Sequence, residues 1–424
     1  MLRIAFQTFG CKLNFAETSA IARKLSEGEF CVVDFSDEAD VYVIHSCMVT
    51  AQAEKKTLQA VRQAHRRSVR ARIAVAGCMA ELQEERLRKE PGVSLVLGNS
   101  DKFRLEEFLL DSGSRITRLT EAGFEASWSV SERTRSFLKI QDGCDYFCAY
   151  CTIPLARGRS RSGTVAEILK AAEEITARGV KEIVLTGVNI GDFGRQNGET
   201  LYQLLLELHQ TEGLERLRIS SIEPDLLEER IVSLSAEYGR LLPHFHIPLQ
   251  AGSNEVLRLM KRRYTTALFS EKVSMIRALL PRACIATDLI CGFPGESDSL
   301  FGESLEYVNL IDISYLHVFS YSVRKGTHAT QLPYPVSPLK IRERSLAFHH
   351  LSDRKKQAFY NSNTGRQARV FFESRNRQGY LYGFTENYIK VRHPWSAELV
   401  NSIQTVTLLT SASADYLNCV ISKS

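Results

Sequence analysis

The chain has 424 residues and a formal net charge of +5, with 44% hydrophobic and 24% charged residues. This length predicts two to four domains, the composition is ordinary for a globular protein, and the small positive charge points only weakly toward nucleic acid. The start Met1–Gln7 lacks the basic and apolar regions of a signal peptide, and no apolar stretch approaches the roughly 20 residues that cross a bilayer. We therefore expect a cytoplasmic protein without membrane contact, whose ten cysteines serve metal binding or catalysis rather than disulfides.

Residues 1–112 alternate short apolar strands with amphipathic helices, which is typical of an α/β domain with a parallel sheet. The expected elements are strands at Arg3–Thr8, Val41–His45, Arg72–Ala76 and Val93–Leu97 and helices at Asn14–Glu27, Thr50–Arg67 and Glu81–Lys89. Cys11, Cys47 and Cys78 follow the first three of these strands. Because ligands of open α/β sheets bind at the carboxyl ends of strands, we expect these cysteines to converge on one site rather than to be unrelated core residues.

A loop-rich connector is expected at 113–135. The next domain, residues 130–360, contains a second alternation of strands and helices that runs to about residue 330, followed by a helical linker. The expected strands are Phe137–Gln141, Glu182–Thr186, Arg216–Ser220, His244–Pro248, Ile285–Ile290 and Tyr315–Ser320. Six strands with crossover helices predict a partial (βα)6 barrel rather than a full eight-stranded one. A charged helix is expected to link this barrel to residues 361–424. It begins at Ser337-Pro338 and runs to about Tyr360.

Cys144, Cys148 and Cys151, spaced C-x3-C-x2-C, lie on the loop after the first barrel strand. Thiolates are soft ligands that select zinc, copper(I) or iron–sulfur clusters. Structural zinc sites and ordinary electron-transfer clusters are closed by four ligands. Three cysteines without a fourth nearby would instead hold a [4Fe-4S] cluster and leave one iron open for a substrate.

Polar residues follow the other barrel strands, at the rim where active sites of such barrels lie. Asn189, Glu223 and Gln250 are candidates for binding a cofactor there, and for each the alternative is a turn-capping role. Three alternating arginines after the cysteine loop could bind RNA phosphates or a carboxylate, or could pair with acids inside the protein: Arg157, Arg159 and Arg161. Other residues are interpreted as structural: the histidines His244 and His246, and the thiols Cys31, Cys284, Cys291 and Cys419, which we expect to be buried.

Residues 361–424 change to short strands, which predicts a small OB-like β-barrel. The expected strands are Arg369–Phe372, Gly379–Phe384, Tyr388–Arg392, Ile403–Leu409 and Tyr416–Ser422. Seven Lys or Arg residues against four acids, with Tyr382 and Lys390 among the interleaved aromatic and basic residues, indicate RNA binding. The alternative is that the aromatic residues form the core of the barrel.

These features resemble the radical S-adenosylmethionine (SAM) enzymes, and the upstream cysteines and terminal barrel narrow the resemblance to the methylthiotransferases. The strings that carry it are Gly10-Cys11-Lys12-Leu13-Asn14, Gly143 to Cys151, Ile153-Pro154, Arg157 to Ser162, Leu185 to Asn189, His246 to Gln250, Met260 to Tyr264 and Gly292 to Glu296. Lys12-Leu13-Asn14 is similar to the MtaB branch, which adds a methylthio group to carbon 2 of N6-threonylcarbamoyladenosine at position 37 of tRNA. The terminal barrel resembles a TRAM domain. The chain departs from the family at His45-Ser46, Glu81 and Ala251, which puts hydrogen bonding around the upstream cysteines in doubt.

The resemblance implies two [4Fe-4S] clusters and SAM as cofactors. Cys144, Cys148 and Cys151 would hold the cluster that cleaves SAM to a 5′-deoxyadenosyl radical, and Cys11, Cys47 and Cys78 would hold a second, sulfur-bearing cluster. The resemblance also assigns SAM contacts: Tyr150 to the adenine, Asn189 to the polar end, and Glu223 and Gln250 to the ribose or amino group.

The implied partners are the anticodon loop of tRNA and a reductant protein such as a flavodoxin or ferredoxin. Alternative activities are methylthiolation of isopentenyl-adenosine in tRNA or of a ribosomal-protein aspartate. A zinc-stabilised RNA-binding protein without catalysis is a further alternative. Two groups of three cysteines, rather than one group of four, argue against it.

Overall fold

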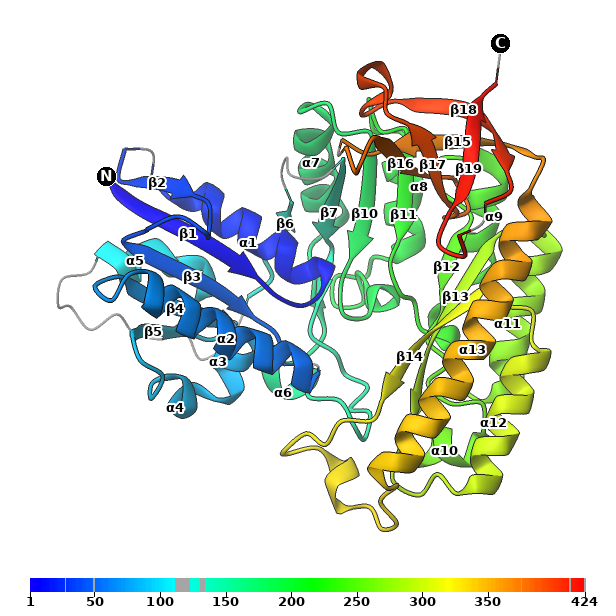
Figure 1. Ribbon diagram of the computed structural model, residues 1–424, viewed down its shortest axis with the longest axis horizontal. Helices are drawn as coiled ribbons and strands as arrows, with labels where there is room; N and C mark the ends of the chain where they lie inside the picture. Colours follow the sequence, from blue (N-terminus) through cyan, green and yellow to red (C-terminus); the bar gives the residue numbers. More distant parts are fainter. Residues whose placement is uncertain are drawn as a thin grey trace.

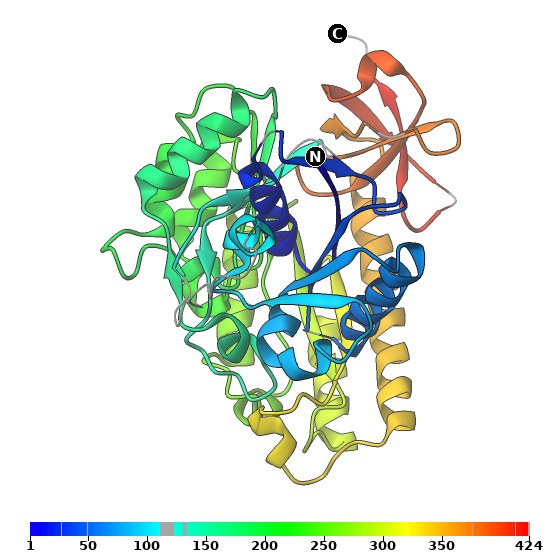
Figure 2. The same ribbon diagram turned by 90° about the vertical axis from the view of Figure 1, so that its left-hand side faces the viewer.

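The computed structural model describes residues 1–26, 28–48, 50–110, 123–129, 134–374, 376–411 and 413–422, and much of the expected connector lies outside them. An α/β sheet, a partial barrel and a small closed β-barrel follow one another along the chain (Figure 1). Figure 2 shows the sheet in front of the partial barrel and the closed barrel at the top. In the described ranges, no helix combines the length and apolar character needed to cross a membrane.

The N-terminal part is a five-stranded parallel sheet in the order β2-β1-β3-β4-β5, which confirms the predicted α/β class. Its elements are β1 (Leu2–Thr8), α1 (Lys12–Lys24), β2 (Phe30–Val33), β3 (Val41–Ser46), α2 (Ala51–Arg67), β4 (Arg72–Gly77), α3 (Cys78–Leu82), α4 (Glu84–Leu87), β5 (Val93–Leu97) and α5 (Leu105–Leu110). The central strand β3 is buried at every position, as expected for an apolar strand covered on both faces of a parallel sheet.

Three features of this domain differ from the sequence-based expectation, and one of them is the helix α5, which was not predicted. The strand β2 was not predicted, because it is a short edge strand in which Phe30 is buried while the next two residues are exposed. The helix expected over Glu81–Lys89 is divided into α3 and α4 at Gln83, whose ψ of 38° is not helical. The helix α3 also begins earlier than expected, where the Ser46 hydroxyl accepts a hydrogen bond from the Met79 N–H at 3.2 Å.

The central part has six parallel strands, which confirms the predicted partial barrel. The barrel strands are β7 (Arg135–Lys139), β10 (Glu182–Thr186), β11 (Arg216–Ile219), β12 (His244–His246), β13 (Cys284–Cys291) and β14 (Tyr315–Ser320), and the short strands beside them are β6 (Ser127–Trp128), β8 (Gln141–Asp142) and β9 (Arg161–Ser162). The helices are α6 (Ile153–Arg157), α7 (Val165–Thr176), α8 (Leu201–Leu208), α9 (Glu229–Tyr238), α10 (Asn254–Leu259), α11 (Thr266–Leu279), α12 (Asp298–Leu310) and α13 (Pro338–Asn363). Capping boxes at Thr164 and Thr200 fix the starts of α7 and α8.

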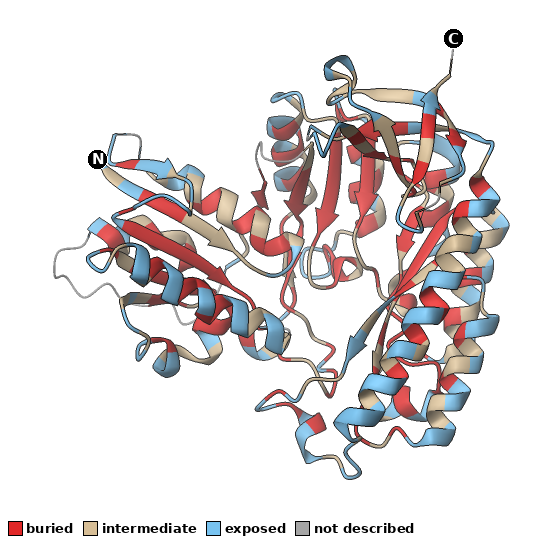
Figure 3. Ribbon diagram, viewed as in Figure 1, coloured by how far each residue is buried: buried red, intermediate tan, exposed pale blue. Residues whose placement is uncertain are grey.

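The barrel is open along one side, between β14 at one edge and β6 and β7 at the other. Except for β14, which is mostly exposed or half-buried, its strands are largely buried, as the red ribbons of Figure 3 show. The strands pack against the helices around them through leucine and isoleucine side chains. The helix α1 of the N-terminal part packs against β6 and β7. The open side of the barrel therefore lies next to the N-terminal sheet.

The C-terminal strands form a closed barrel in the order β15-β16-β17-β19-β18, which confirms the predicted OB-like fold. They are β15 (Gln367–Phe372), β16 (Tyr380–Phe384), β17 (Lys390–Pro394), β18 (Ile403–Leu409) and β19 (Leu417–Ile421). Alternate residues such as Val370 and Phe372 fill the interior.

A buried charge cluster attaches this terminal barrel to the amino-terminal ends of the central strands. Glu182 accepts from Arg216 at 2.7 Å and from Arg218 at 2.9 Å. Both guanidinium groups also donate to backbone carbonyls between β16 and β17, including that of Thr385 at 3.0 Å and 2.8 Å. In the same loop, the Tyr388 ring stacks on His244 with centroids 4.2 Å apart. The terminal barrel thus docks on the rim opposite the cysteine loop.

We expect Glu182→Gln to destabilise the protein by about 3–5 kcal/mol, because it leaves buried arginines without their counter-ion. Burial opposes ionisation of Glu182, but Arg218, Arg216 and Arg135 lower its pKa from 4.5 to about 2. The stabilisation is therefore present above pH 4.5 and is lost as the pH falls toward 2. Thermal unfolding between pH 7 and pH 3 measures both effects.

The matched control is Glu215→Gln, since the Glu215 side chain is 39% exposed and pairs with Lys181 at the surface. This variant should change stability by less than about 0.5 kcal/mol. Equal melting temperatures for the Glu182 and Glu215 variants would contradict the role of Glu182 as the counter-ion of the buried arginines.

Candidate functional site

The three upstream cysteines lie at the carboxyl ends of the neighbouring strands β1, β3 and β4. Cys11 precedes α1, Cys47 follows β3, and Cys78 begins α3. Gly10 has a φ of +106°, and a Cβ there would lie 2.9 Å from the Cys47 Sγ. The Cys11 and Cys78 thiols are close enough to interact electrostatically. The fold therefore brings three cysteines from distant points in the sequence to one edge of the sheet.

Residues that depart from the family pattern make their own hydrogen bonds around these cysteines. The imidazole Nδ1 of His45 lies 2.8 Å from the Thr18 hydroxyl, and the Ser46 hydroxyl donates to the Ala76 carbonyl at 2.6 Å. Glu81 accepts from the backbone N–H of Asn99 at 2.8 Å. The departures at these positions are thus accommodated by the local hydrogen bonding.

The loop with Cys144, Cys148 and Cys151 follows β8 and is turned by Gly143. Gly143 has a φ of +67°, and a Cβ there would lie 1.9 Å from the Arg159 carbonyl oxygen, so only glycine fits. The backbone N–H groups of Tyr146 and Ile153 donate to the sulfurs of Cys144 and Cys151, each at 3.4 Å. The loop thus holds two of its sulfurs through backbone donors.

Burial raises the pKa of Cys144 to about 11 and that of Cys151 to about 12, so both are thiols unless a metal displaces the proton. Within the described ranges, no three Cys, His, Asp or Glu side chains are close enough to hold a single metal ion. Three thiol donors on one loop are the soft ligand type that iron–sulfur clusters take.

Arg262 joins this loop to the polar rim, and sequence reasoning did not identify it as a site residue. Its guanidinium lies 3.0 Å from the Cys148 Sγ and 3.4 Å from the Tyr150 hydroxyl, and it forms an ion pair with Glu223. Burial raises the pKa of Glu223 to about 7 although Arg262 opposes the shift. The sequence feature that could have indicated Arg262 is the basic run Lys261-Arg262-Arg263, which lies in the string Met260 to Tyr264 that resembles the family.

Asn189 and Gln250 both lie buried at the carboxyl ends of barrel strands, as predicted. The Asn189 side-chain nitrogen is 3.4 Å from Asp192, but its buried Oδ1 has no hydrogen-bond partner in the described structure. Gln250 has a φ of +68°, an uncommon conformation for a residue other than glycine. A buried acceptor without a protein partner among the described residues and a strained backbone suit this rim to bind a polar ligand.

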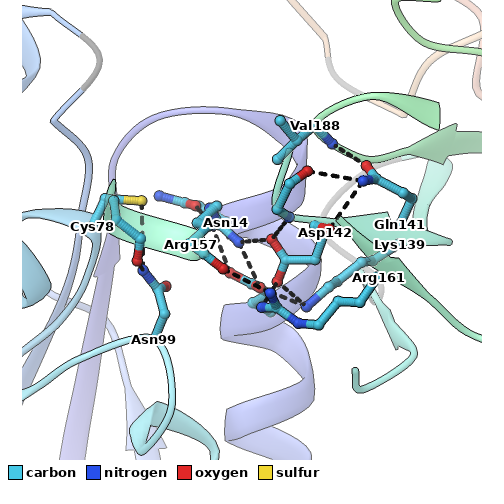
Figure 4. Close-up of polar contacts among 12 residues, drawn as sticks. Asn14, Cys78, Asn99, Lys139, Gln141, Asp142, Arg157, Arg161 and Val188 are labelled. Atoms are coloured by element: carbon cyan, nitrogen blue, oxygen red, sulfur yellow. Dashed lines mark hydrogen bonds and ion pairs between the residues drawn. The ribbon is translucent and has the colours of Figure 1, made fainter. Parts of the chain in front are cut away.

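Arg157 corrects a prediction, because its guanidinium is buried and paired and cannot contact RNA. It binds Asp142 at 2.9 Å and the Asn14 side-chain oxygen at 2.7 Å (Figure 4). It also binds Glu17 at 3.0 Å. Because Asn14 lies three residues after Cys11 and Arg157 six residues after Cys151, this link joins the segments that carry the two cysteine groups.

The other two arginines have different surroundings. Arg161 is mostly buried and binds Asp142 at 2.9 Å, whereas Arg159 is 74% exposed and pairs with Asp145 at 3.0 Å. Of the three arginines, Arg159 alone keeps an accessible guanidinium, so RNA binding stays a prediction for this residue.

The terminal barrel carries a mixed aromatic and basic face. The Lys390 ammonium lies 4.9 Å from the centroid of the Tyr382 ring, and Arg392 lies 4.2 Å from that of Tyr380. Tyr382 and Lys390 are both partly exposed. In contrast, Tyr388 packs against the central barrel, so only part of the predicted aromatic set is available for RNA.

The residues interpreted as structural are mostly where expected. Cys284, Cys291 and Cys419 are buried, but Cys31 is exposed on the edge strand β2, which corrects that prediction. His244 is buried against Tyr388, and His246 lies 2.9 Å from Asp288.

Comparisons with known proteins agree with this arrangement. The radical SAM superfamily matches residues 138–308, and the uncharacterized protein family UPF0004 matches residues 3–98. A solved structure of the radical S-adenosylmethionine methyltransferase TsrM from Kitasatospora setae, with tryptophan substrate and a SAM analogue bound, has a TM-score of 0.57 and 13% identity, and the match covers 75% of this chain and 73% of that one. At this identity the likeness extends to the fold alone.

Two curated relatives span nearly the whole chain. A threonylcarbamoyladenosine tRNA methylthiotransferase MtaB of Aquifex aeolicus is 37% identical over 92% of this chain and 96% of its own. A tRNA-2-methylthio-N(6)-dimethylallyladenosine synthase of Syntrophus aciditrophicus is 30% identical over 96% of this chain and 91% of its own. With its two cysteine groups and this similarity, the protein belongs to the radical SAM methylthiotransferase family, in its MtaB branch.

Proposed function

We propose that this protein adds a methylthio group to carbon 2 of N6-threonylcarbamoyladenosine at position 37 of tRNA. The observation that carries the proposal is the pair of cysteine triads on segments that Asn14 and Arg157 join at 2.7 Å. This arrangement supports two clusters, each with three cysteine ligands, that would lie on either side of one domain contact. A single metal site closed by four ligands would not need two groups of three cysteines on two domains.

In this proposal Cys144, Cys148 and Cys151 hold one [4Fe-4S] cluster, and the polar rim binds SAM. When bound, the cluster and SAM supply the one-electron chemistry that removes hydrogen from an unactivated carbon. Asn189, whose buried Oδ1 has no hydrogen-bond partner among the described residues, would bind the polar end of SAM, and Tyr150 and Gln250 lie on the same rim. Arg262 would offset the negative charge of a cluster-bound Cys148 thiolate, and its ion pair with Glu223 orients that carboxylate.

Cys11, Cys47 and Cys78 would hold the second cluster, which bears the sulfur to be transferred. Cys11 is exposed whereas the other two are buried, so the accessible side of this group is the side of Cys11. Asn14 supports the loop of Cys11 by donating to the Phe9 carbonyl at 2.8 Å.

The tRNA would lie across the terminal barrel and the open side of the central barrel. We assign contacts with the RNA phosphate backbone to the face around Tyr382 and Lys390, where cations lie beside partly exposed rings. A cytoplasmic reductant protein such as a flavodoxin or ferredoxin stays a prediction, as does the anticodon loop as the bound region.

Isopentenyl-adenosine is the second candidate substrate, because a relative with the dimethylallyladenosine synthase name is 30% identical. The higher identity of 37% with the Aquifex relative favours threonylcarbamoyladenosine. The non-catalytic zinc-binding alternative is set aside by family membership, and no residue of the described site favours a ribosomal-protein substrate.

Nucleoside analysis of tRNA from a deletion strain tests the substrate. We expect complete loss of the methylthio group on threonylcarbamoyladenosine and retention of the methylthio group on isopentenyl-adenosine. Re-expression of the intact chain should restore the lost nucleoside, whereas a Cys148→Ala chain should not. Retention of both modified nucleosides in the deletion strain would refute the proposed substrate.

A further inference from the structure

The sulfur of Cys148 has a different hydrogen-bond donor from the other two sulfurs of its loop. Cys144 and Cys151 accept from neutral backbone N–H groups at 3.4 Å. Cys148 instead accepts from the guanidinium of Arg262 at 3.0 Å, and the Arg262 side chain is only 3% exposed. Among the hydrogen bonds of the described ranges, this is the one in which a charged side chain donates to a cysteine of this loop.

Arg262 is held in place by contacts at each of its side-chain nitrogens. Its Nε donates to the Tyr264 hydroxyl at 3.1 Å, and that hydroxyl donates to the Leu249 carbonyl at 3.0 Å. Its Nη2 forms the ion pair with Glu223, while Nη1 is the donor to Cys148. Because the guanidinium is planar and all three nitrogens have partners, its orientation toward the sulfur is fixed.

The backbone also joins the segment of Arg262 to the cysteine loop. The N–H of Ala149, the residue directly after Cys148, donates to the Met260 carbonyl at 2.9 Å. Lys261 then turns the chain with a φ of +58°, and Arg262 follows. The contact between guanidinium and sulfur is therefore supported by a backbone bond between the same two segments.

A buried cation beside a ligand sulfur changes how readily an iron–sulfur cluster accepts an electron. Reduction makes the cluster and its thiolates more negative, and a positive charge nearby stabilises the added charge where the surroundings are poorly polar. Hydrogen bonds to the sulfurs are one of the features that set the reduction potential of such clusters. Glu223 offsets part of the charge of Arg262, but it pairs with Nη2 and not with the nitrogen at the sulfur. The arrangement therefore favours the reduced state of a cluster on this loop.

We propose that Arg262 raises the reduction potential of the cluster on the cysteine loop, as a positioning residue that acts through the Cys148 sulfur. The inference rests on the proposed function in one respect, namely that Cys144, Cys148 and Cys151 hold a [4Fe-4S] cluster, and it does not depend on the substrate nucleoside. Reduction adds one electron from an external one-electron reductant, and Arg262 stays protonated throughout. The residue thereby eases the electron transfer that must precede SAM cleavage.

A redox titration of the reconstituted holoenzyme with dithionite, followed by electron paramagnetic resonance, tests the inference. The signal that changes when SAM is added belongs to the loop cluster, and the signal of the upstream cluster is an internal reference. We expect Arg262→Gln to lower the equilibrium constant for reduction of the loop cluster by about 10-fold, the low end for a hydrogen bond to a charged group. A tenfold change corresponds to about 59 mV for one electron. Arg262→Lys keeps the charge, so its potential should lie between those of wild type and Arg262→Gln.

The matched control is Arg258→Gln, because Arg258 lies on α10 just before this segment, is 70% exposed and pairs with Glu255 at 2.7 Å. This variant should keep the wild-type potential of the loop cluster. The potential of the upstream cluster should be the same in all variants, since the charge change is made beside the loop. Iron content, measured in each preparation, shows whether a variant holds both clusters.

A loop-cluster potential in Arg262→Gln that equals or exceeds that of wild type would overturn the inference. If Arg262→Gln holds too little iron to be titrated, Arg262→Lys decides: a potential below that of wild type supports the inference, and an equal or higher one overturns it. A wild-type holoenzyme without any signal that responds to SAM would instead refute the cluster site of the proposed function itself.

Discussion

Cys148→Ala is expected to abolish SAM cleavage, whereas Cys47→Ala is expected to keep cleavage and lose methylthiolation. The two residues belong to different cysteine groups, one on the loop after β8 and one on the edge of the N-terminal sheet. Loss of a direct ligand should exceed the roughly 10- to 100-fold loss that removal of an outer hydrogen-bond partner causes. Formation of 5′-deoxyadenosine and of methylthiolated nucleoside, measured in the same anaerobic reaction, distinguishes the two steps.

The matched control is Cys31→Ala, because Cys31 is an exposed cysteine outside both groups. It should retain both products and the wild-type iron content. Methylthiolated nucleoside from the Cys47→Ala enzyme would show that the upstream cysteines do not hold the sulfur source. Cleavage of SAM by the Cys148→Ala enzyme would remove the loop cysteines from the cofactor site.

Glu17→Gln is expected to lower the free energy of unfolding by about 3–5 kcal/mol, because it leaves buried cations without their shared carboxylate. Glu17 is fully buried and binds Lys102 at 2.7 Å, Lys139 at 2.9 Å and Arg157 at 3.0 Å. Burial opposes its ionisation, but Arg157, Lys102 and Lys139 hold the pKa of Glu17 well below 4.5. Its stabilisation is therefore present above pH 4.5 and is lost as the pH falls below that value. Denaturant unfolding of the purified protein measures the change.

The same variant should separate the two chemical steps, because Glu17 joins the N-terminal sheet to the central barrel. The rate of methylthiolation should fall more than the rate of SAM cleavage, because only methylthiolation needs the two cysteine groups to be correctly positioned relative to each other. Glu107→Gln is the control, because Glu107 is 55% exposed and pairs with Arg104 within one surface turn. If Glu17→Gln were as stable and as active as Glu107→Gln, the buried cluster would have no role in aligning the two parts.

Much of the fold followed from local patterns in the sequence. The six barrel strands and the five terminal strands fell close to their expected positions, because alternation of apolar runs with helical segments is a property of neighbouring residues. The cysteine groups were also identified in advance, since each cysteine directly follows a strand and the carboxyl ends of parallel strands meet at one edge.

Contacts between distant segments could not be read from those patterns. The edge strand β2, with the exposed Cys31, has too few buried residues to give a periodic signal. Arg262 reaches Cys148 across more than one hundred residues. The exposed or buried state of an arginine depends on which acids the fold places beside it, and no spacing rule supplies this information.

The sequence by itself determined the classes of secondary structure, the two cysteine groups and the family of this protein. The tertiary structure decided that Arg157 is an internal link rather than an RNA contact, that Tyr388 secures the terminal barrel, and that Arg262 lies beside Cys148. The physical reason is that the spacing of apolar residues in a segment shows only which side of that helix or strand is buried. Ion pairs and domain contacts depend on which elements, distant in the sequence, the fold brings into contact.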